Sequence, residues 1–381
     1  MKNVLNFAGN RPTLLKGPKS GFTAGRFFRG LIVSLGLCAA SLAHAGTVVV
    51  YAAADLQITT PLIADFEKLH PDIKVVYHDL QSTELYDRFL NEIGERAKAD
   101  VIWSSAMDLQ MKLVNDGHAA PHRSGETAAL PAWAKWRDEA YGTTFEPVCF
   151  AYNRYLLPRE AVPQTHADLA RLLAERPELF RDRLATYDPH RSGLGYLLHT
   201  QDLEANPVVF WNLIRAMTRT GLGTEPTTTQ MLDRIVSGKS VLGYNVLCSY
   251  AHAREKSAPQ IGTVMPQDYT LVMTRIAFVS KYAPHPNEAR AWLDYMLSKR
   301  GQDIFNEIGL HSVRTEAQGV SSVASLRKQL GNAFRIIGLG TGLLTYIDQG
   351  KRDLFLTRWD TVLGDSAPMP LTTGAAPKAA R

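Results

Sequence analysis

Residues 47–77 read TVVVYAAADLQITTPLIADFEKLHPDIKVVY, which contains a strand signal, a helix signal and a second strand signal in succession. The β-branched runs at 47–51 and 73–77 favour extended structure. Between them, residues 61–69 place their apolar side chains at helical spacing. We therefore predict a strand, a short loop, a helix and a second strand.

The same unit recurs along the chain. The strand signal at 73–77 is followed by a helical pattern over 84–93, and ADVIW (99–103) is followed by another over 108–115. Three such units in succession predict a mostly parallel sheet covered by helices. Residues 154–262 carry a further series of strand and helix patterns and predict a second α/β layer.

Two extended segments connect these layers. TTFEPVCFAYN (143–153) contains Pro147, which suits an edge strand or a crossover between domains. YTLVMTRIAFVS (269–280) is a strongly β-forming run that follows the second layer. A chain that leaves one α/β lobe near 145 and returns near 265 forms two lobes with a cleft between them. The expected boundaries are 46–145 plus 265–315 for lobe 1, 146–264 for lobe 2, 316–365 for C-terminal helices packing on a lobe and 366–381 for a frayed tail.

The first 45 residues have the features of an export signal. They contain six Lys or Arg and no Asp or Glu, and an apolar run over 31–42 precedes the small-x-small triplet 43–45. This run is shorter than the roughly 20 residues that a membrane-spanning helix needs. We predict a signal peptide over 1–45 and a periplasmic mature protein. A lipid-modified Cys38 is the alternative, and Leu37 before it disfavours that alternative.

Composition excludes several functions. The chain carries a net charge of +5, and without its leader the charge is −1, with no basic cluster in the remainder. We therefore exclude nucleic acid as a partner. The sequence has no Gly-x-Ser-x-Gly, His-Glu-x-x-His or Cys-x-x-Cys motif, so we predict no enzyme activity, cofactor or metal site. Cys149 and Cys248 either pair in an oxidising compartment or are two buried small hydrophobic residues.

Four junctions between strand and helix signals have the composition of a binding site: 52–55 (AAAD), 81–84 (QSTE), 104–107 (SSAM) and 188–195 (DPHRSGLG). In open α/β sheets, ligands bind at the carboxyl ends of strands, where helix N-termini direct N–H groups outward. In the last junction, Arg191 offers a bidentate fork, Ser192 offers a hydroxyl, and glycine permits close backbone approach. An anion cradle and an ordinary turn with a serine N-cap both fit this composition. The serines and threonines of the other junctions also suit N-caps.

Two further positions complete the candidates. A strand ending at Tyr244-Asn245 would present a hydroxyl and an amide to the cleft, unless the tyrosine ring lies in the core. Arg275 is the only charge in its apolar run, so it needs either an anionic ligand or a structural ion pair. The candidate ligand-binding residues are Ala54, Asp55, Ser82, Thr83, Glu84, Ser104, Ser105, Asp188, His190, Arg191, Ser192, Gly193, Tyr244, Asn245, Ser249, Tyr250 and Arg275.

Several segments together resemble the periplasmic solute-binding proteins of ABC importers, and more narrowly their ferric-iron and phosphoglycerate-type cluster. The resemblance covers about residues 46–315 and is carried by the leader, VVVYAAADL, YDPHRSGLGY, VLGYNVLCSY and KYAPHPNEARAWLDYMLSKRGQDIF. It implies a type II two-lobed fold and a monomer that captures a small solute by lobe closure. It also implies delivery to an ABC permease in the inner membrane, while some relatives signal to a membrane sensor kinase.

The resemblance bears on the solute as well. Ferric binders use two adjacent tyrosines near the strand end that here reads Cys248-Ser249-Tyr250, and this chain contains no Tyr-Tyr pair. Relatives that bind organic phosphates use hydroxyls, helix N-termini and basic side chains. The matching positions here are Ser82, Thr83, Ser104, Arg191 and Ser192. We predict a small anionic solute, namely an organophosphate such as phosphoglycerate or a sugar phosphate, with ferric iron or ligand sensing as alternatives.

Overall fold

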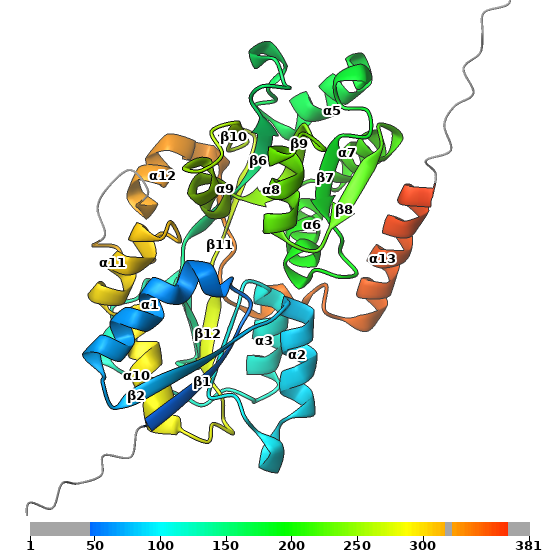
Figure 1. Cartoon of the computed structure of the whole chain (residues 1–381). Coiled ribbons are helices and arrows are strands. Elements are labelled where there is room, and N and C mark those ends of the chain that lie inside the picture. The colour runs from blue at the N-terminus through cyan, green and yellow to red at the C-terminus, as the bar shows by residue number, and fades with distance from the viewer. Residues whose placement is uncertain (1–45, 317–321, 365–381) are drawn as a thin grey trace, which may run out of the picture. The chain divides into compact units, whose positions relative to one another are not determined.

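The computed structural model describes residues 46–316 and 322–364, and these form two sheets flanked by helices (Figure 1). The predicted signal peptide, the alternative at Cys38 and the tail from 366 lie outside the described residues. Within these ranges, no helix is both long and apolar enough to cross a bilayer. The expected α/β architecture of two sheets flanked by helices is confirmed. The sheets are mixed rather than mostly parallel, because the strands at 146–153 and 276–279 pair antiparallel with their neighbours.

The first sheet, with the helices on it, is called lobe 1. Its strand order is β2-β1-β3-β12-β5-β4, in which β1 pairs in parallel with β2 and β3. Strands β12 and β5 run antiparallel to their neighbours. The elements are β1 (Gly46–Ala52), α1 (Leu56–Leu69), β2 (Ile73–Asp79), α2 (Ser82–Asn91), β3 (Val101–Ser104), α3 (Met107–Asn115), α4 (Gly125–Ala128), β4 (Lys135–Trp136), β5 (Ala140–Gly142), β12 (Ile276–Val279), α10 (Pro286–Leu297) and α11 (Lys299–Glu307).

The second sheet, with its helices, is called lobe 2. Its strand order is β13-β11-β6-β9-β7-β8, and β10 also pairs with β6. Strand β7 pairs in parallel with β8 and β9. The elements are β6 (Glu146–Asn153), α5 (His166–Glu175), β7 (Leu184–Tyr187), α6 (Gly193–Ala205), α7 (Pro207–Arg219), β8 (Leu222–Glu225), α8 (Thr228–Val236), β9 (Leu242–Leu247), α9 (Cys248–Glu255), β10 (Ile261–Val264), β11 (Thr270–Met273), α12 (Val323–Leu330), β13 (Phe334–Ile336) and α13 (Gln349–Gly364).

The apolar run at 269–280 is divided between the two sheets. Its first half is β11 in lobe 2 and its second half is β12 in lobe 1, so the chain returns at residues 274–275 rather than near 265. The reason is the pairing of β11 with β6, in which Val272 lies opposite Pro147 and Met273 lies opposite Glu146. Pro147 therefore lies in an inner strand rather than an edge strand, directly after the point where the chain enters lobe 2.

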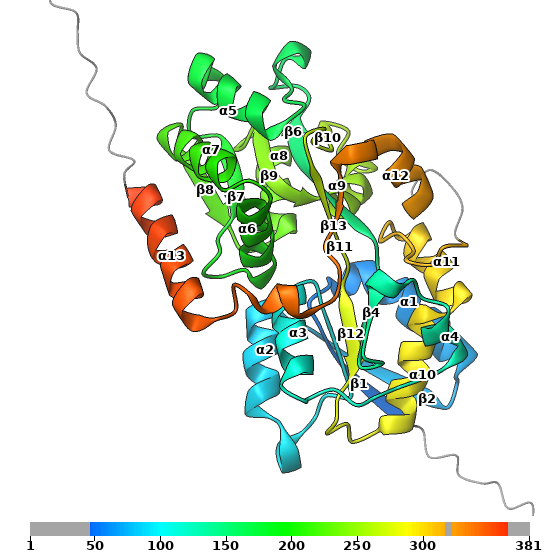
Figure 2. The same ribbon diagram turned by 180° about the vertical axis from the view of Figure 1, so that it is seen from behind.

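The C-terminal segment contacts both lobes. Strand β13 extends the lobe 2 sheet beside β11, and the short helix η6 (Thr341–Leu344) then packs on α3 of lobe 1. Helix α13 ends the described chain and lies against α7 of lobe 2 (Figure 2). Its Phe355 and Trp359 are buried in the lobe 2 core, where the Trp359 ring lies 4.7 Å from that of His199.

A buried ion pair joins the two segments that cross between the lobes, one at the start of β6 and the other at residues 274–275. The Arg275 side chain is only 2% exposed, and its Nε donates to Glu146 Oε1 at 2.8 Å. Arg275 Nη1 also donates to the carbonyl of Ala53 in lobe 1 at 2.5 Å. Glu146 accepts from the hydroxyls of Thr144 at 2.8 Å and Ser249 at 2.7 Å. The structural ion pair considered for Arg275 is therefore present in the hinge.

We predict that Glu146→Ala lowers the free energy of unfolding by about 3–5 kcal/mol, because it leaves the Arg275 guanidinium buried without a counter-ion. Removing both charges in Glu146→Ala/Arg275→Met should recover much of this loss. Glu255→Ala is the matched control, because its pair with Arg154 is partly exposed and contributes at most about 1 kcal/mol. Urea denaturation measures all three, and equal losses for Glu146→Ala and Glu255→Ala would contradict the assignment.

Candidate functional site

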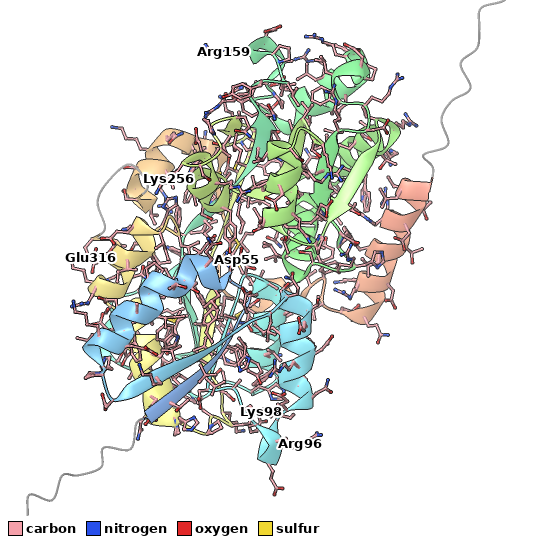
Figure 3. All side chains as sticks on the ribbon, viewed as in Figure 1. Asp55, Arg96, Lys98, Arg159, Lys256 and Glu316 are labelled. Atoms are coloured by element: carbon pink, nitrogen blue, oxygen red, sulfur yellow. The ribbon has the colours of Figure 1, made fainter. Side chains whose placement is uncertain are left out.

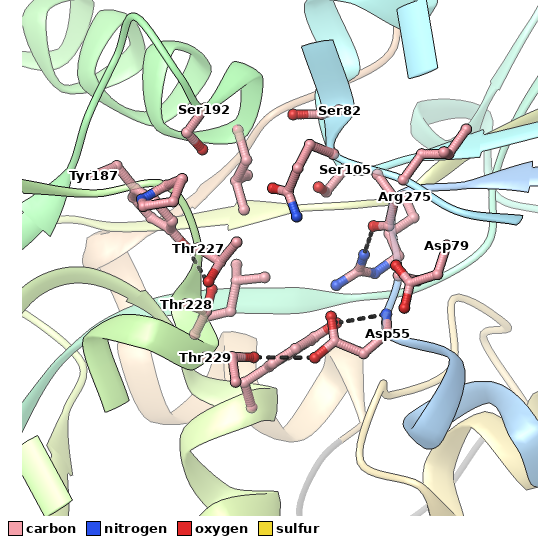
Figure 4. Close-up of a pocket in the computed structure, with 18 residues that line it drawn as sticks. Asp55, Asp79, Ser82, Ser105, Tyr187, Ser192, Thr227, Thr228, Thr229 and Arg275 are labelled. Carbon is pink, nitrogen blue, oxygen red and sulfur yellow. Dashed lines mark hydrogen bonds between the residues drawn. The ribbon is translucent and has the colours of Figure 1, made fainter. Parts of the chain in front are cut away.

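A pocket lies between the two lobes (Figure 4). It encloses about 460 Å³, including space open to solvent at its mouth. Loops that follow β1, β2 and β3 of lobe 1 and β7, β8 and β9 of lobe 2 line it, together with the hinge residue Arg275. The lining residues are Ala53, Ala54, Asp55, Asp79, Leu80, Gln81, Ser82, Ser105, Tyr187, Ser192, Leu194, Pro226, Thr227, Thr228, Thr229, Leu247, Tyr250 and Arg275.

Helix N-termini from both lobes meet at this pocket. Helices α1, α2 and α3 begin at its lobe 1 loops, and α6, α8 and α9 begin at its lobe 2 loops. The residues that precede α2 and α3 provide no side-chain cap, whereas Ser192 caps α6 and Thr227 caps α8. First-turn N–H groups without an intrahelical partner carry partial positive charge and attract anions. The pocket is therefore bordered by donors that suit a negatively charged group.

Hydroxyl groups add to these donors. Figure 4 shows Ser82, Ser105 and Ser192 gathered on one side of the pocket. Thr227, Thr228 and Thr229 approach from the start of α8. Each hydroxyl can donate one hydrogen bond and accept others, so this lining adapts to the oxygens of a polar solute.

Charged groups occupy another side of the pocket. Asp55, Asp79 and Arg275 lie close together there (Figure 4). Burial raises the pKa of Asp79, although its Oδ2 accepts from the N–H of Leu56 at 2.9 Å. Asp55 Oδ2 accepts from the hydroxyl of Thr229 at 3.0 Å. Carboxylates have additional lone pairs, so both side chains can also accept from solute hydroxyls.

The two lobes touch across the pocket. The Asp55–Thr229 hydrogen bond joins the residue that precedes α1 of lobe 1 to the first turn of α8 of lobe 2. The N–H of Gly193, at the start of α6, donates to Ser82 Oγ at 3.1 Å. A Cβ atom on Gly193 would lie 2.9 Å from that oxygen and 3.1 Å from Ala106 Cβ, so only glycine fits here without displacement. Figure 3 shows Asp55 at this boundary, while Arg96 and Lys98 lie at the far end of lobe 1. The structure is thus a closed arrangement of the lobes.

Comparison with known proteins identifies the family. The model of the bacterial extracellular solute-binding proteins matches residues 48–311. The chain belongs to this family. It is 38% identical to the substrate binding protein of an ABC transporter from Agrobacterium tumefaciens, whose crystal structure superposes with a TM-score of 0.80 over 84% of this chain and 94% of that chain. A comparison with curated sequences returns no match.

More distant structures share the fold. Iron-bound HitA from Pseudomonas aeruginosa is 17% identical, with a TM-score of 0.67 over 83% of this chain and 99% of that chain. AfuA from Actinobacillus pleuropneumoniae, solved with fructose-6-phosphate, is 19% identical, with a TM-score of 0.68 over 84% of this chain and 99% of that chain. The chain is therefore a periplasmic solute-binding protein of an ABC transporter, a class that binds a small solute and delivers it to a membrane permease. None of these comparisons points to a sensor kinase.

The structure of this solute-binding protein places some of the predicted site residues together in one pocket. The predicted residues that line the pocket are Ala54, Asp55, Ser82, Ser105, Ser192, Tyr250 and Arg275. Two others support its loops, since Gly193 bonds to Ser82 and Ser104 Oγ accepts from the N–H of Ala106 at 3.2 Å. Thr83 and Glu84 follow Ser82 on α2 but are not among the lining residues.

The loop at 188–191 lies outside the pocket. Asp188 accepts from the N–H of His190 at 2.9 Å and closes the turn. His190 Nε2 contacts Asp360 of α13 at 2.8 Å. The side chain of Arg191 is 60% exposed, and its nearest carboxylate oxygen, on Asp188, is 4.0 Å away. The turn with a serine N-cap is therefore present, and only Ser192 extends from it into the lining.

The expected placement of Tyr244 and Asn245 at the cleft is wrong, because β9 continues to Leu247. Both side chains point into lobe 2 and donate to the buried carboxylate of Asp202, at 2.7 and 2.6 Å. Ser249 lies beneath the pocket and donates to Glu146. Cys149 and Cys248 are buried free thiols, as the second of the two alternatives expected, and Cys248 is the first residue of α9.

Several lining residues escaped the sequence analysis. Asp79 ends a strand that was predicted to stop at Tyr77, and Tyr187 ends β7. Thr227, Thr228 and Thr229 follow β8, a short strand with half-buried residues that was not predicted. The run PTTT before a helical pattern was a usable signal, because it is typical of a helix start.

We predict that Gly193→Ala opens the lobes of the ligand-free protein, because the new methyl group collides with Ser82 and Ala106 across the boundary. Small-angle X-ray scattering should give a larger radius of gyration than for wild type. The control is Gly125→Ala at the start of α4, where a Cβ meets nothing within 4 Å. Equal radii for the two variants would show that α6 does not restrain closure.

Proposed function

We propose that the solute is a small phosphorylated compound with several hydroxyl groups, such as phosphoglycerate or a sugar phosphate. The observation that carries this proposal is the meeting of α2, α3 and α6 at one pocket, each beginning beside a serine hydroxyl. A phosphate group accepts many hydrogen bonds and is stabilised by the dipoles of helix N-termini. Ser82, Ser105 and Ser192 are the residues proposed to hold it.

The charged side of the pocket suits the rest of such a molecule. Arg275 is already neutralised by Glu146, so the guanidinium adds little net positive charge to the pocket. Asp55 and Asp79 add negative charge, which repels a second anionic group placed beside them. The two carboxylates favour a hydrogen-bond donor of the solute beside them, and the hydroxyls of a sugar or glycerate are such donors. We assign no contact with the solute to Arg191, because its side chain lies outside the lining.

Lobe closure provides the mechanism of capture. Both lobes supply lining residues, so the solute contacts the complete set only when the lobes are closed. A ligand that binds one state more tightly shifts the population toward that state. The closed complex is then the form proposed to dock on an ABC permease in the inner membrane and to release its solute there.

We predict that phosphorylated compounds of three to seven carbons raise the melting temperature in a thermal-shift screen that also includes dicarboxylates and Fe(III). For the best compound, Ser82→Ala and Ser105→Ala should each weaken binding about ten-fold or more, since a hydrogen bond to a charged group contributes about 1.5–3 kcal/mol. Isothermal titration calorimetry measures this loss. Ser237→Ala is the control, because its exposed hydroxyl lies at the other end of α8.

Other outcomes would favour other functions. A coloured complex with Fe(III), without stabilisation by phosphorylated compounds, would indicate a ferric-binding protein. Release of inorganic phosphate during prolonged incubation would indicate hydrolysis, whereas intact recovered solute is expected of a binding protein. Stabilisation by dicarboxylates alone would contradict the phosphate assignment while leaving anion binding in place.

A further inference from the structure

Asp108 is a buried carboxylate at the junction of the two lobes. It lies in the first turn of α3 and is 2% exposed. Its Oδ1 accepts from the N–H of Leu109 at 2.8 Å, whereas its Oδ2 is buried without a hydrogen-bond partner. An ionised carboxylate oxygen buried without a partner is costly, and the same group in its protonated, neutral form costs far less.

The surroundings of Asp108 come from both lobes. Helix α3 packs on α6 of lobe 2, on β12 and on the short helix η6. Among the facing groups that carry or acquire charge, Tyr196 of α6 and Arg352 of α13 interact electrostatically with Asp108. Neither η6, which reads TGLL, nor β12, which reads IAFV, supplies a titratable side chain. Two of the elements around this carboxylate therefore belong to lobe 2 and move with it.

We propose that closing the lobes is coupled to uptake of a proton by Asp108, so that the protein closes more readily as the pH falls. Opening the lobes removes α6 and α13 from α3 and returns the carboxylate to water, where it ionises at its ordinary pKa. In the closed arrangement burial raises the pKa of Asp108 to about 7, despite the opposing effect of the Arg352 charge. This device acts on closure itself and is independent of which solute the pocket takes.

The sign and size of the effect follow from linkage. The closed state binds the proton more tightly, so lowering the pH through the closed-state pKa favours closure. Between pH 8 and pH 6 the equilibrium constant for closure should rise about ten-fold, because the closed state is mostly ionised at the first pH and mostly protonated at the second. Above pH 8 Asp108 is ionised in both states, and far below the open-state pKa it is protonated in both. In these two ranges its contribution to closure no longer changes with pH.

The test uses fluorophores on Arg96→Cys and Arg159→Cys, two exposed positions at the far ends of lobes 1 and 2 (Figure 3). Energy transfer in the ligand-free protein should report more closure at pH 6 than at pH 8. Asp108→Asn, which mimics the neutral acid, should close equally at both values. The same pH response in wild type and Asp108→Asn, or no response in wild type, would overturn the proposal.

A second measurement does not depend on the fold of that variant. The ¹³C resonance of the Asp108 carboxyl group reports its titration directly in the otherwise native chain. We expect a midpoint near neutral pH in wild type and a lower one in Gly193→Ala, whose added methyl group obstructs closure. An ordinary aspartate midpoint in wild type would overturn the proposal, whatever the solute proves to be.

Discussion

The buried pair of Arg275 and Glu146 is the constraint on which the two-lobed arrangement depends. Glu146 opens β6, where the chain enters lobe 2, and Arg275 stands where the chain returns to lobe 1. Two charges in this dry position are tolerable only as partners with further hydrogen bonds, which Thr144, Ser249 and Ala53 supply. The ion pair thereby fixes the two crossing segments relative to each other. We infer that the lobes rotate about the backbone around Glu146 and Arg275.

This pair also determines the chemistry of the pocket floor. Ser249 donates its hydroxyl hydrogen to Glu146 and is buried beneath the lining residues, so it does not face the pocket. The Arg275 guanidinium lies 5.5 Å from the centre of the Tyr250 ring and keeps that ring at the pocket wall. The positive charge of Arg275 is neutralised by Glu146. Backbone N–H groups and hydroxyls are therefore the groups that attract an anion to the pocket. Such donors are fixed by the helices that bear them, so they need little reorganisation when a solute arrives.

The sequence predicts the features that are local. Strands β1, β2 and β3 follow from β-branched or apolar runs, and Ser82, Ser105 and Ser192 follow from the composition of helix starts after strands. Contacts between distant segments have no local signal. Asp79 accepts from the first N–H of α1, and this contact helps to explain why that helix begins at Leu56, five residues before the predicted start at residue 61.

The division of 269–280 between two sheets is hidden for a similar reason. Its apolar residues suit a buried strand in either sheet, so only the pairing of β11 with β6 reveals the break at Thr274 and Arg275. Tyr244 and Asn245 show the opposite case, in which strand prediction was nearly right in extent. The predicted strand ended two residues too early, so Tyr244 and Asn245 were placed at the cleft. In the structure both side chains lie inside lobe 2, where they donate to Asp202 of α6.

The pocket and Asp108 lie on the same mobile boundary, and this has a thermodynamic consequence. Helix α3 begins beside Ser105 at the pocket and carries Asp108 in its first turn, while α6 begins beside Ser192 and carries Tyr196. Two ligands that favour the same state of one two-state element must favour each other's binding by the same factor. A solute that closes the lobes therefore raises the proton affinity of Asp108, and a proton on Asp108 raises the affinity for the solute. The coupling needs no contact between the two sites, because the rigid helices transmit it through the closure of the lobes.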